Sequence, residues 1–242
     1  MSIDYSIVIP AYNEVDWLPD MLVAVKKAMA MTSLSGEIIV CDNNSTDETA
    51  SCAQASGAKV VFEPHNQISR ARNTGAGAAS GRYLIFIDAD TLITGELLAE
   101  ALTRLQSNKY CGGGSVVNFD IPINTISKWG LKAWTWFSVS LGLAAGCFVF
   151  CKREDFEAVG GFSENVYASE EIWFSRAIMR RAKKRGERFS IITDYPVISS
   201  GRKMQWFSMG KQSVLVLMLI LFPYLIRYRK FCWFWYKRPD KK

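Results

Sequence analysis

The sequence predicts an α/β fold with a mainly parallel central sheet flanked by helices, and three observations support that prediction. Short stretches rich in β-branched residues alternate with segments of helical periodicity through about the first 90 residues, as in sheets built from β-α units. Of the 242 residues, 49% are hydrophobic, which is enough for a substantial core. Polar residues gather directly after the predicted strands, where ligands bind in sheets of this kind.

The first half contains four predicted strands and three predicted helices. Each strand is a short apolar run followed by a proline or an acid. The strands are residues 5–9, 37–41, 59–62 and 83–87. The helices are residues 15–31, 47–55 and 67–80, and the second is expected to open with a capping box at Ser45-Thr46-Asp47-Glu48.

The second half is less regular. A Gly-rich strand over residues 110–118 leads to an aromatic segment at 129–137, and another apolar strand is predicted over 146–152. After the turn at Gly160-Gly161-Phe162, residues 169–185 have the pattern of a long helix, with acids at its start and Arg or Lys at its end, as the helix dipole prefers. We interpret the chain as one α/β domain over residues 1–204 and an appendage over residues 205–242.

The appendage is basic and rich in aromatic residues. From Arg202 to Lys242 there are ten Lys or Arg and one acid, whereas the whole chain has a net charge of +6. The apolar run over residues 213–226 is shorter than the roughly 20 residues of a membrane-spanning helix. Trp, Tyr, Lys and Arg together are typical of the bilayer interface, so we expect this segment to associate with the membrane surface. A core helix and a single tilted span are the alternatives.

The pair Asp88-Ala89-Asp90 follows the fourth predicted strand. Two carboxylates one residue apart can reach one cation from a loop, and Mg²⁺ and Mn²⁺ prefer oxygen ligands and keep open positions for phosphate. Such an ion neutralises a diphosphate leaving group. The pattern often marks only a solvated turn, but its place after a buried strand favours a metal site at Asp88 and Asp90.

Other polar residues converge on the same edge of the predicted sheet. Asp42 is placed either to accept hydrogen bonds from a nucleobase or to cap a helix. Arg72 can pair with phosphate or lie as a cation on a helix surface. Glu170 and Glu171 open the long helix, where a carboxylate can act as a general base or complement the helix dipole. His65 is the only histidine, which excludes a His-based triad and a multi-His metal site.

Several motifs, taken in order, resemble those of the family 2 inverting glycosyltransferases, which have the GT-A fold. The resemblance covers roughly residues 5–203, and the ordered series is far more specific than any one motif. The motifs are Ser6-Ile7-Val8-Ile9-Pro10-Ala11-Tyr12-Asn13-Glu14, Val40-Cys41-Asp42-Asn43-Asn44-Ser45-Thr46-Asp47, Ala71-Arg72-Asn73-Thr74-Gly75, Ile87-Asp88-Ala89-Asp90-Thr91, Gly146-Cys147-Phe148-Val149-Phe150, Val159-Gly160-Gly161-Phe162 and Ser169-Glu170-Glu171.

The resemblance implies a nucleotide-sugar donor, UDP- or GDP-linked, and a divalent cation, Mn²⁺ or Mg²⁺. It implies Asp90, together with Asp88, as the metal ligand, Gly146 at the acceptor, and Glu171 or Glu170 as the catalytic base. The family usually has Glu-Asp at this pair, so Glu171 is a longer base than usual. The residues implied at the donor nucleotide are Pro10, Ala11, Tyr12, Glu14, Asp42, Arg72, Asp88 and Arg202.

The chain is therefore expected to be a metal-dependent inverting glycosyltransferase of the GT-A type, which moves a sugar to a hydroxyl or phosphate acceptor. One alternative is a nucleotidyltransferase of related fold, but such enzymes usually have a Gly- and Lys-rich loop where this chain has Pro10-Ala11-Tyr12-Asn13-Glu14. Another is a catalytically inactive, membrane-attached binder of sugar nucleotides. Gly75-Ala76-Gly77 follows polar residues rather than a strand, which argues against a dinucleotide-binding oxidoreductase.

Composition also predicts where the chain acts. Residues 1–5 do not resemble a secretory signal. The six cysteines form no CxxC pair and lie mostly in apolar runs, which favours reduced thiols in a cytosolic setting rather than a zinc site. The basic aromatic tail favours attachment to the inner face of the membrane and a lipid-linked or glycan acceptor. No nucleic-acid partner is expected.

Overall fold

A single curved sheet forms the centre of the molecule. The computed structural model describes residues 3–122 and 125–237, so the end of the predicted appendage, residues 238–242, lies outside the described residues. Within them the strand order is β3-β2-β1-β4-β7-β6-β8-β5. The strands are β1 (Tyr5–Ala11), β2 (Gly36–Asp42), β3 (Lys59–Phe62), β4 (Tyr83–Ile87), β5 (Thr91–Leu92), β6 (Tyr110–Phe119), β7 (Phe148–Lys152) and β8 (Arg188–Ser199).

The N-terminal half of this sheet is parallel. β1 pairs in parallel with β2 and β4, and β2 pairs in parallel with β3. β7 runs antiparallel between β4 and β6, while β6 pairs in parallel with the long strand β8. The prediction of an α/β fold with a mainly parallel sheet is thus confirmed, and the strands predicted in the first half lie where the sequence placed them.

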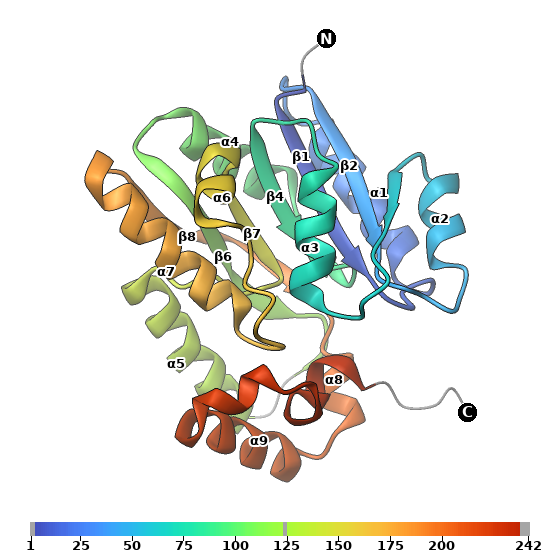
Figure 1. The fold of residues 1–242 in the computed structure, drawn as a ribbon, viewed down its shortest axis with the longest axis vertical. Coiled ribbons are helices and arrows are strands. Elements are labelled where there is room, and N and C mark those ends of the chain that lie inside the picture. The colour runs from blue at the N-terminus through green and yellow to red at the C-terminus, as the bar shows by residue number, and fades with distance from the viewer. Residues whose placement is uncertain (1–2, 123–124, 238–242) are drawn as a thin grey trace.

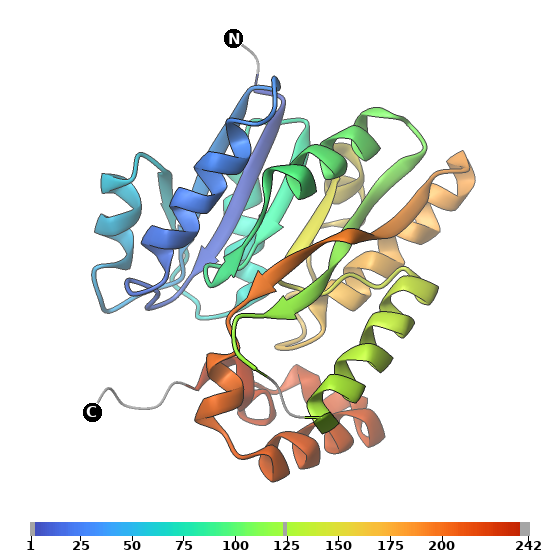
Figure 2. The same cartoon turned by 180° about the vertical axis from the view of Figure 1, so that it is seen from behind.

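Helices cover both faces of the sheet (Figures 1 and 2). In β1, Ile7 and Ile9 belong to the core on one face and Val8 to the core on the other, because successive strand side chains point to opposite faces. This double burial explains the continuous apolar run of the strand. α1 (Leu18–Met29) and α4 (Gly95–Gln106) pack on one face, and α3 (Ile68–Gly77), α6 (Arg153–Val159) and α7 (Glu170–Ala182) on the other.

The predicted capping box is wrong. α2 (Thr49–Ala55) begins two residues later than expected, and the side chain of Glu48, at its N-cap, makes no capping hydrogen bond. The backbone N–H of Thr49 donates to Oδ1 of Asp47 at 3.0 Å. Ser45 instead accepts a hydrogen bond from the backbone N–H of Asn13 at 3.0 Å. The hydroxyl thus joins the loop after β2 to the loop after β1, which the local sequence pattern does not reveal.

The C-terminal appendage packs against the carboxyl ends of the strands, at the lower end of the molecule in Figure 1. The predicted apolar run does not form one helix, because α9 (Met209–Leu221) ends before Pro223 and a 3₁₀ turn follows. Among the described residues, no helix has both the length and the apolar character needed to cross a membrane. The remaining elements here are α8 (Arg202–Trp206), the 3₁₀ turns Pro223–Arg227 and Arg229–Phe231, and α10 (Trp233–Tyr236).

Candidate active site

A pocket opens where the parallel strands end. Its lining includes six of the residues that the sequence implied for donor or metal: Pro10, Ala11, Tyr12, Glu14, Asp88 and Asp90. Because β1 and β4 are parallel neighbours, their carboxyl ends deliver these loops to the same edge of the sheet. The structure therefore brings together the first and the fourth motif of the sequence.

Arg202 joins two of these carboxylates. Its Nη2 lies 2.7 Å from both carboxylate oxygens of Glu14 and 2.9 Å from Oδ2 of Asp90. The guanidinium is buried, and its Cζ lies over the rings of Trp17 and Trp206, at 5.1 and 5.4 Å from their centroids. Arg202 is therefore at the site, as the sequence implied, but in this structure its partners are carboxylates.

Arg72 forms a second, deeper ion cluster. Its Nη1 donates to Glu170 at 2.7 Å, and its Nη2 donates to Asp88 at 2.8 Å and to the carbonyl oxygen of Gly146 at 2.7 Å. The Arg72 side chain is only 2% exposed. The interpretation of Arg72 as a surface cation is therefore wrong, because α3 packs its polar face inward onto the ends of β4 and α7.

Glu171 lies beside this cluster without joining its ion pairs. Glu171 is half-buried, and a Cβ on Gly146 would lie 3.6 Å from its carboxylate and 3.3 Å from Nη2 of Arg72, so the missing side chain keeps the space between these groups open. Burial, and then the neighbouring charge of Glu170, raises the pKa of Glu171 to about 8, although Arg72 opposes the shift. A carboxylate with a pKa near working pH is suited to remove a proton.

The backbone at this edge adopts conformations that few residues accept. Asn13, Asn44 and Ser169 have φ values of 53°, 65° and 60°, in the left-handed region. Asn tolerates that region, but Ser does so rarely, and such outliers cluster at functional sites. Ser169 immediately precedes Glu170, so the strained residue sets the direction in which α7 begins.

Asp42 lies at the end of β2 but does not line the pocket. Its Oδ1 accepts the backbone N–H of Ser45 at 3.0 Å, so it shapes the loop that follows β2. The neighbouring Asn43 does line the pocket and holds the chain around residues 63–67 by hydrogen bonds to the carbonyls of Glu63 and His65. Five other residues that the sequence implied are likewise not part of the lining: Arg72, Gly146, Glu170, Glu171 and Arg202.

A divalent cation fits the residues present. Four carboxylates, from Glu14, Asp88, Asp90 and Glu170, pair with two buried guanidinium groups, so the site has room for added positive charge. Asp88 and Asp90 supply the hard oxygen donors that Mg²⁺ and Mn²⁺ prefer. The described residues contain no cluster of three or more acidic, His or Cys ligands, so such an ion would take its other ligands from phosphate and water.

Much of the remaining pocket lining was not predicted from the sequence. Four of these side chains belong to the appendage, whose aromatic residues were interpreted only as a membrane signal. The signal that could have indicated them is the run of Trp and Tyr that ends in Lys at residues 233–237, which also suits a nucleotide. The lining residues that were missed are Asn43, Asn66, Ile68, Lys203, Trp206, Trp235, Tyr236 and Lys237.

One relative matches this chain in sequence over less than half of its length, whereas a solved structure matches its fold over most of it. An uncharacterized glycosyltransferase of Rickettsia conorii is 29% identical over 109 residues, which are 43% of this chain and 18% of that protein. The chain thus matches less than a fifth of that relative's length. The mannosyltransferase PcManGT of Pyrobaculum calidifontis, solved with GDP-Man and Mn²⁺, superimposes with a TM-score of 0.65 and 19% identity. That match covers 89% of this chain and 61% of the other.

A second solved structure has the same fold, and a family model matches most of the chain. Residues 1–349 of S. aureus TarS in complex with UDP-GlcNAc give a TM-score of 0.64 at 16% identity, over 92% of this chain and 66% of that one. The model of glycosyl transferase family 2 matches residues 6–160, which include the loops after β1, β2 and β4 and the residues of α3. On this evidence the chain belongs to glycosyl transferase family 2.

Proposed function

We propose that this protein is a metal-dependent, inverting glycosyltransferase that uses a nucleoside-diphosphate sugar. The observation that carries the proposal is the pairing of Asp88 and Asp90 at the pocket with Arg72 and Glu171 behind it. Asp88 and Asp90 are suited to hold a cation that carries a diphosphate, and Glu171 is suited to remove a proton. The complex of PcManGT with GDP-Man and Mn²⁺ supports the same kind of donor and ion for this chain.

The reaction is a single displacement at the anomeric carbon. An acceptor oxygen forms a bond to that carbon while the bond to the diphosphate oxygen breaks, so the configuration inverts. Glu171 takes the acceptor proton, and Arg72 holds Asp88 and the Gly146 carbonyl in place through two short hydrogen bonds. A divalent ion held by Asp88 and Asp90 would neutralise charge on the departing diphosphate.

The charge around Glu171 favours a hydroxyl acceptor. Glu170 and Asp88 both contact Arg72, so the guanidinium that acts on Glu171 is already neutralised by two carboxylates. An anionic phosphate acceptor would meet net repulsion there, whereas a neutral hydroxyl would not. A hydroxyl also needs a base, and a phosphate oxygen does not.

The acceptor is proposed to be lipid-linked and presented at the membrane surface. Val214, Leu217 and Leu221 are 57–67% exposed, and their spacing of three and four residues places them on one face of α9. Lys211, three residues before Val214 on the same helix, and Arg227, in the 3₁₀ turn that follows, are also exposed. Apolar surface bordered by cations is the composition of a helix that lies on an anionic bilayer.

A second element adds to this surface. α5 (Thr125–Leu141) lies at the same end of the molecule as α9 (Figure 2). It exposes Trp129 and Trp136 by 68% and 64%, and the ammonium group of Lys132 lies 5.4 Å from the Trp129 ring centroid. Tryptophan beside lysine is favoured where the apolar and aqueous phases meet. This face would place the pocket close to the lipid headgroups.

The proposal is tested by the stereochemistry of transfer and by one variant. With a donor that turns over, NMR should show inverted configuration in the first product. Glu171→Gln, which keeps the size of the side chain, should lower kcat at least 100-fold while binding of UDP or GDP with Mn²⁺ stays within about twofold. Retained configuration, or full turnover by Glu171→Gln, would sink the assignment. Binding of the donor without any turnover by the unmodified chain would favour the inactive binder.

A further inference from the structure

Part of the pocket wall comes from residues after the predicted domain boundary at residue 204. Trp206, at the end of α8, lies there beside Lys203 of the same helix, and Trp235, Tyr236 and Lys237 come from the last described part of the chain. We call residues 229–237 the C-terminal arm. These side chains line the same pocket as the loops after β1 and β4.

The arm is anchored on the loop before α7 and on the start of α3. The backbone N–H of Tyr167 donates to the carbonyl of Ile226 at 2.7 Å, just before the arm begins, and Cys232 is fully buried in a small core at this place. The Tyr236 ring meets the Tyr167 ring edge-on at 5.8 Å. The N–H of Ile68, at the first turn of α3, donates to the Tyr236 hydroxyl at 3.3 Å.

Two side chains of the arm are shielded from water. Cys232 is fully buried, and burial is the main reason why the pKa values of Cys232 and Tyr236 are raised, with a smaller contribution from the charge of Glu170. The arm is therefore packed into the molecule at the place where Tyr236 lines the pocket.

Charge complementarity indicates what this wall would bind. The strand-end wall carries Glu14, Asp88 and Asp90, so alone it repels a diphosphate. Arg202 is already engaged by two of these carboxylates. Within the lining that the structure describes, positive charge comes from Lys203 and Lys237, beside the aromatic rings of the appendage. Aromatic faces stack nucleobases, and lysine pairs with phosphate.

We propose that the C-terminal arm is part of the donor site, with Trp235 and Tyr236 giving aromatic surface to the nucleoside and Lys237, together with Lys203, giving positive charge to the diphosphate. The inference rests on the proposed function, because it names further binding residues of the same site. It also assigns the end of the appendage a role in donor binding in addition to any role at the membrane.

The test compares pairs of matched variants in the full chain. Lys237→Ala removes an exposed lysine of the pocket lining, and Lys230→Ala removes an exposed lysine of the same arm outside that lining. Trp235→Leu and Trp233→Leu likewise each remove a half-buried tryptophan, and Trp233 packs on Phe207 instead. The ligands are UDP and GDP, each with Mn²⁺. Kd is measured by calorimetry at 50 and 300 mM salt, because interactions between exposed charges are screened more strongly at the higher concentration.

We expect Lys237→Ala to weaken nucleotide binding about fivefold at low salt and to reduce its salt dependence, because a phosphate contact is lost. Trp235→Leu should weaken it about tenfold, the scale of one lost base–aromatic stack. Lys230→Ala and Trp233→Leu should bind within about twofold of the unmodified chain. Melting temperatures measured in parallel show that every variant compared is folded.

Two results would overturn the inference. Equal affinities in all four variants would show that the arm is only a structural cover. Tighter binding by Lys237→Ala would show that the arm opposes the nucleotide. In either case, loss of Mn²⁺-dependent binding in Asp90→Asn would leave the proposed function standing. If the unmodified chain binds neither nucleotide, the proposed function itself fails.

Discussion

At the scale of single residues, the division of labour between Glu170 and Glu171 follows from their partners. Glu170 is buried and paired with Arg72 at 2.7 Å, so its charge is stabilised by that guanidinium. Glu171 has no place in that ion pair, and burial together with the negative charge of Glu170 raises its pKa to about 8. Two adjacent acids with different surroundings can thus take different roles, one structural and one as the base.

The pH dependence of activity should reveal this pair. Because Glu171 must lose its proton to act as base, kcat/KM should rise with pH to a half-maximal value near pH 8. Glu170→Gln removes the neighbouring negative charge, so the half-maximal pH should fall. A profile in Glu170→Gln that is unchanged, or shifted upward, would contradict the account of the Glu171 pKa.

Stability should depend on the same proton. Since the pKa of Glu171 is raised from 4.5 to about 8, the folded state keeps a proton that the unfolded chain loses between these values. The contribution of this group is fully present below about pH 4.5 and is lost as the pH rises through about 8.

Glu171→Gln cannot lose that proton. The free energy of unfolding of Glu171→Gln, taken relative to that of the unmodified chain, should therefore increase as the pH rises from 5 to 9. Denaturant unfolding at several pH values measures this difference. A difference that stays constant over the range would argue against a raised pKa.

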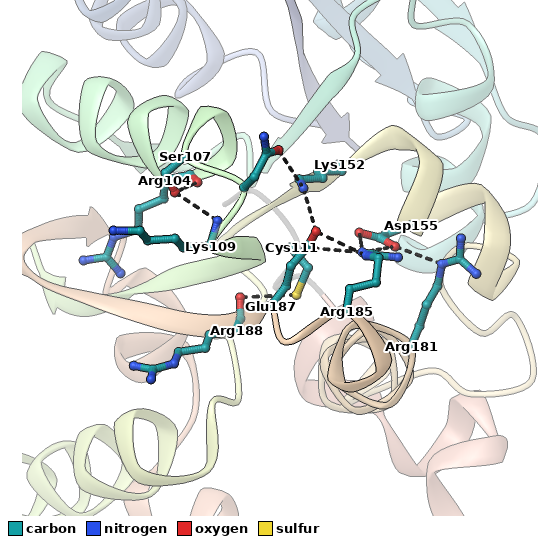
Figure 3. Close-up of polar contacts among 11 residues, drawn as sticks. Arg104, Ser107, Lys109, Cys111, Lys152, Asp155, Arg181, Arg185, Glu187 and Arg188 are labelled. Atoms are coloured by element: carbon teal, nitrogen blue, oxygen red, sulfur yellow. Dashed lines mark hydrogen bonds and ion pairs between the residues drawn. The ribbon is translucent and has the colours of Figure 1, made fainter.

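At the scale of elements, a third ion cluster fixes α6 against the C-terminal end of α7, the opposite end of that helix from Glu170 and Glu171. Asp155 is fully buried and accepts hydrogen bonds from Arg181 at 2.9 Å and Arg185 at 2.7 Å, while Glu187 pairs with Lys152 at 3.0 Å (Figure 3). Arg181 and Arg185 are themselves partly exposed. The cluster therefore joins two helices rather than forming an open binding surface.

Asp155→Ala should lower the free energy of unfolding by about 2 kcal/mol, because the buried partner of two arginines is lost while both arginines still reach water. Urea unfolding measures the change. The matched control is Glu157→Ala, whose exposed side chain pairs with Arg153 at 3.6 Å and should matter by less than about 0.5 kcal/mol. Equal effects of the two substitutions would contradict a structural role for Asp155.

The elements that the sequence predicts best are those defined by local patterns. The strands at the start of the chain are short apolar runs buried on both faces, so their composition alone indicates them. Neither α4, whose N-terminus is capped by Thr94, nor β8 is predicted from the sequence. Polar residues and Pro196 interrupt the second half of β8, and its register with β6 shifts between Ser115 and Val117.

The site was predictable only in part for a similar reason. The motifs predict Asp88, Asp90 and Arg72 as site residues, because each lies after a predicted strand or in a predicted helix. Their partners depend on contacts between distant segments: Arg202 reaches Glu14 across 188 residues, and Tyr236 reaches Ile68 across 168. No local pattern carries such pairings, so neither the Arg202 cluster nor the arm could be derived before the fold was known.

At the scale of the whole molecule, the appendage and the domain it packs on form one unit around the pocket. Deleting residues 205–242 would therefore remove pocket lining together with any membrane contact, and could not separate the two roles. Point substitutions on the exposed face of α9 separate them. Val214 and Leu217 lie on that face and outside the pocket between the strand ends and the arm.

The double variant Val214→Asp/Leu217→Asp should lose binding to anionic vesicles at least about 30-fold, because two apolar side chains no longer enter the bilayer and negative charge is added. Flotation with phosphatidylglycerol vesicles measures this, with phosphatidylcholine vesicles for comparison. Val23→Asp on α1, where Val23 is 51% exposed, is the control and should bind normally. Unchanged binding by the double variant would exclude α9 as the membrane-facing helix.

The central claim is a metal-dependent donor site at Asp88 and Asp90, and ligand-induced thermal stabilisation tests it most directly. UDP, GDP and their sugar conjugates are screened with and without Mn²⁺ on the unmodified chain and on Asp90→Asn. A ligand present at about 100 times its Kd adds about 2.7 kcal/mol to the stability of the folded state, which is roughly 5 °C or more for a chain of this size. We predict that at least one nucleotide raises the melting temperature only when Mn²⁺ is present, and that Asp90→Asn loses this effect. Equal stabilisation of Asp90→Asn, or no stabilisation of the unmodified chain by any nucleotide, would contradict the claim.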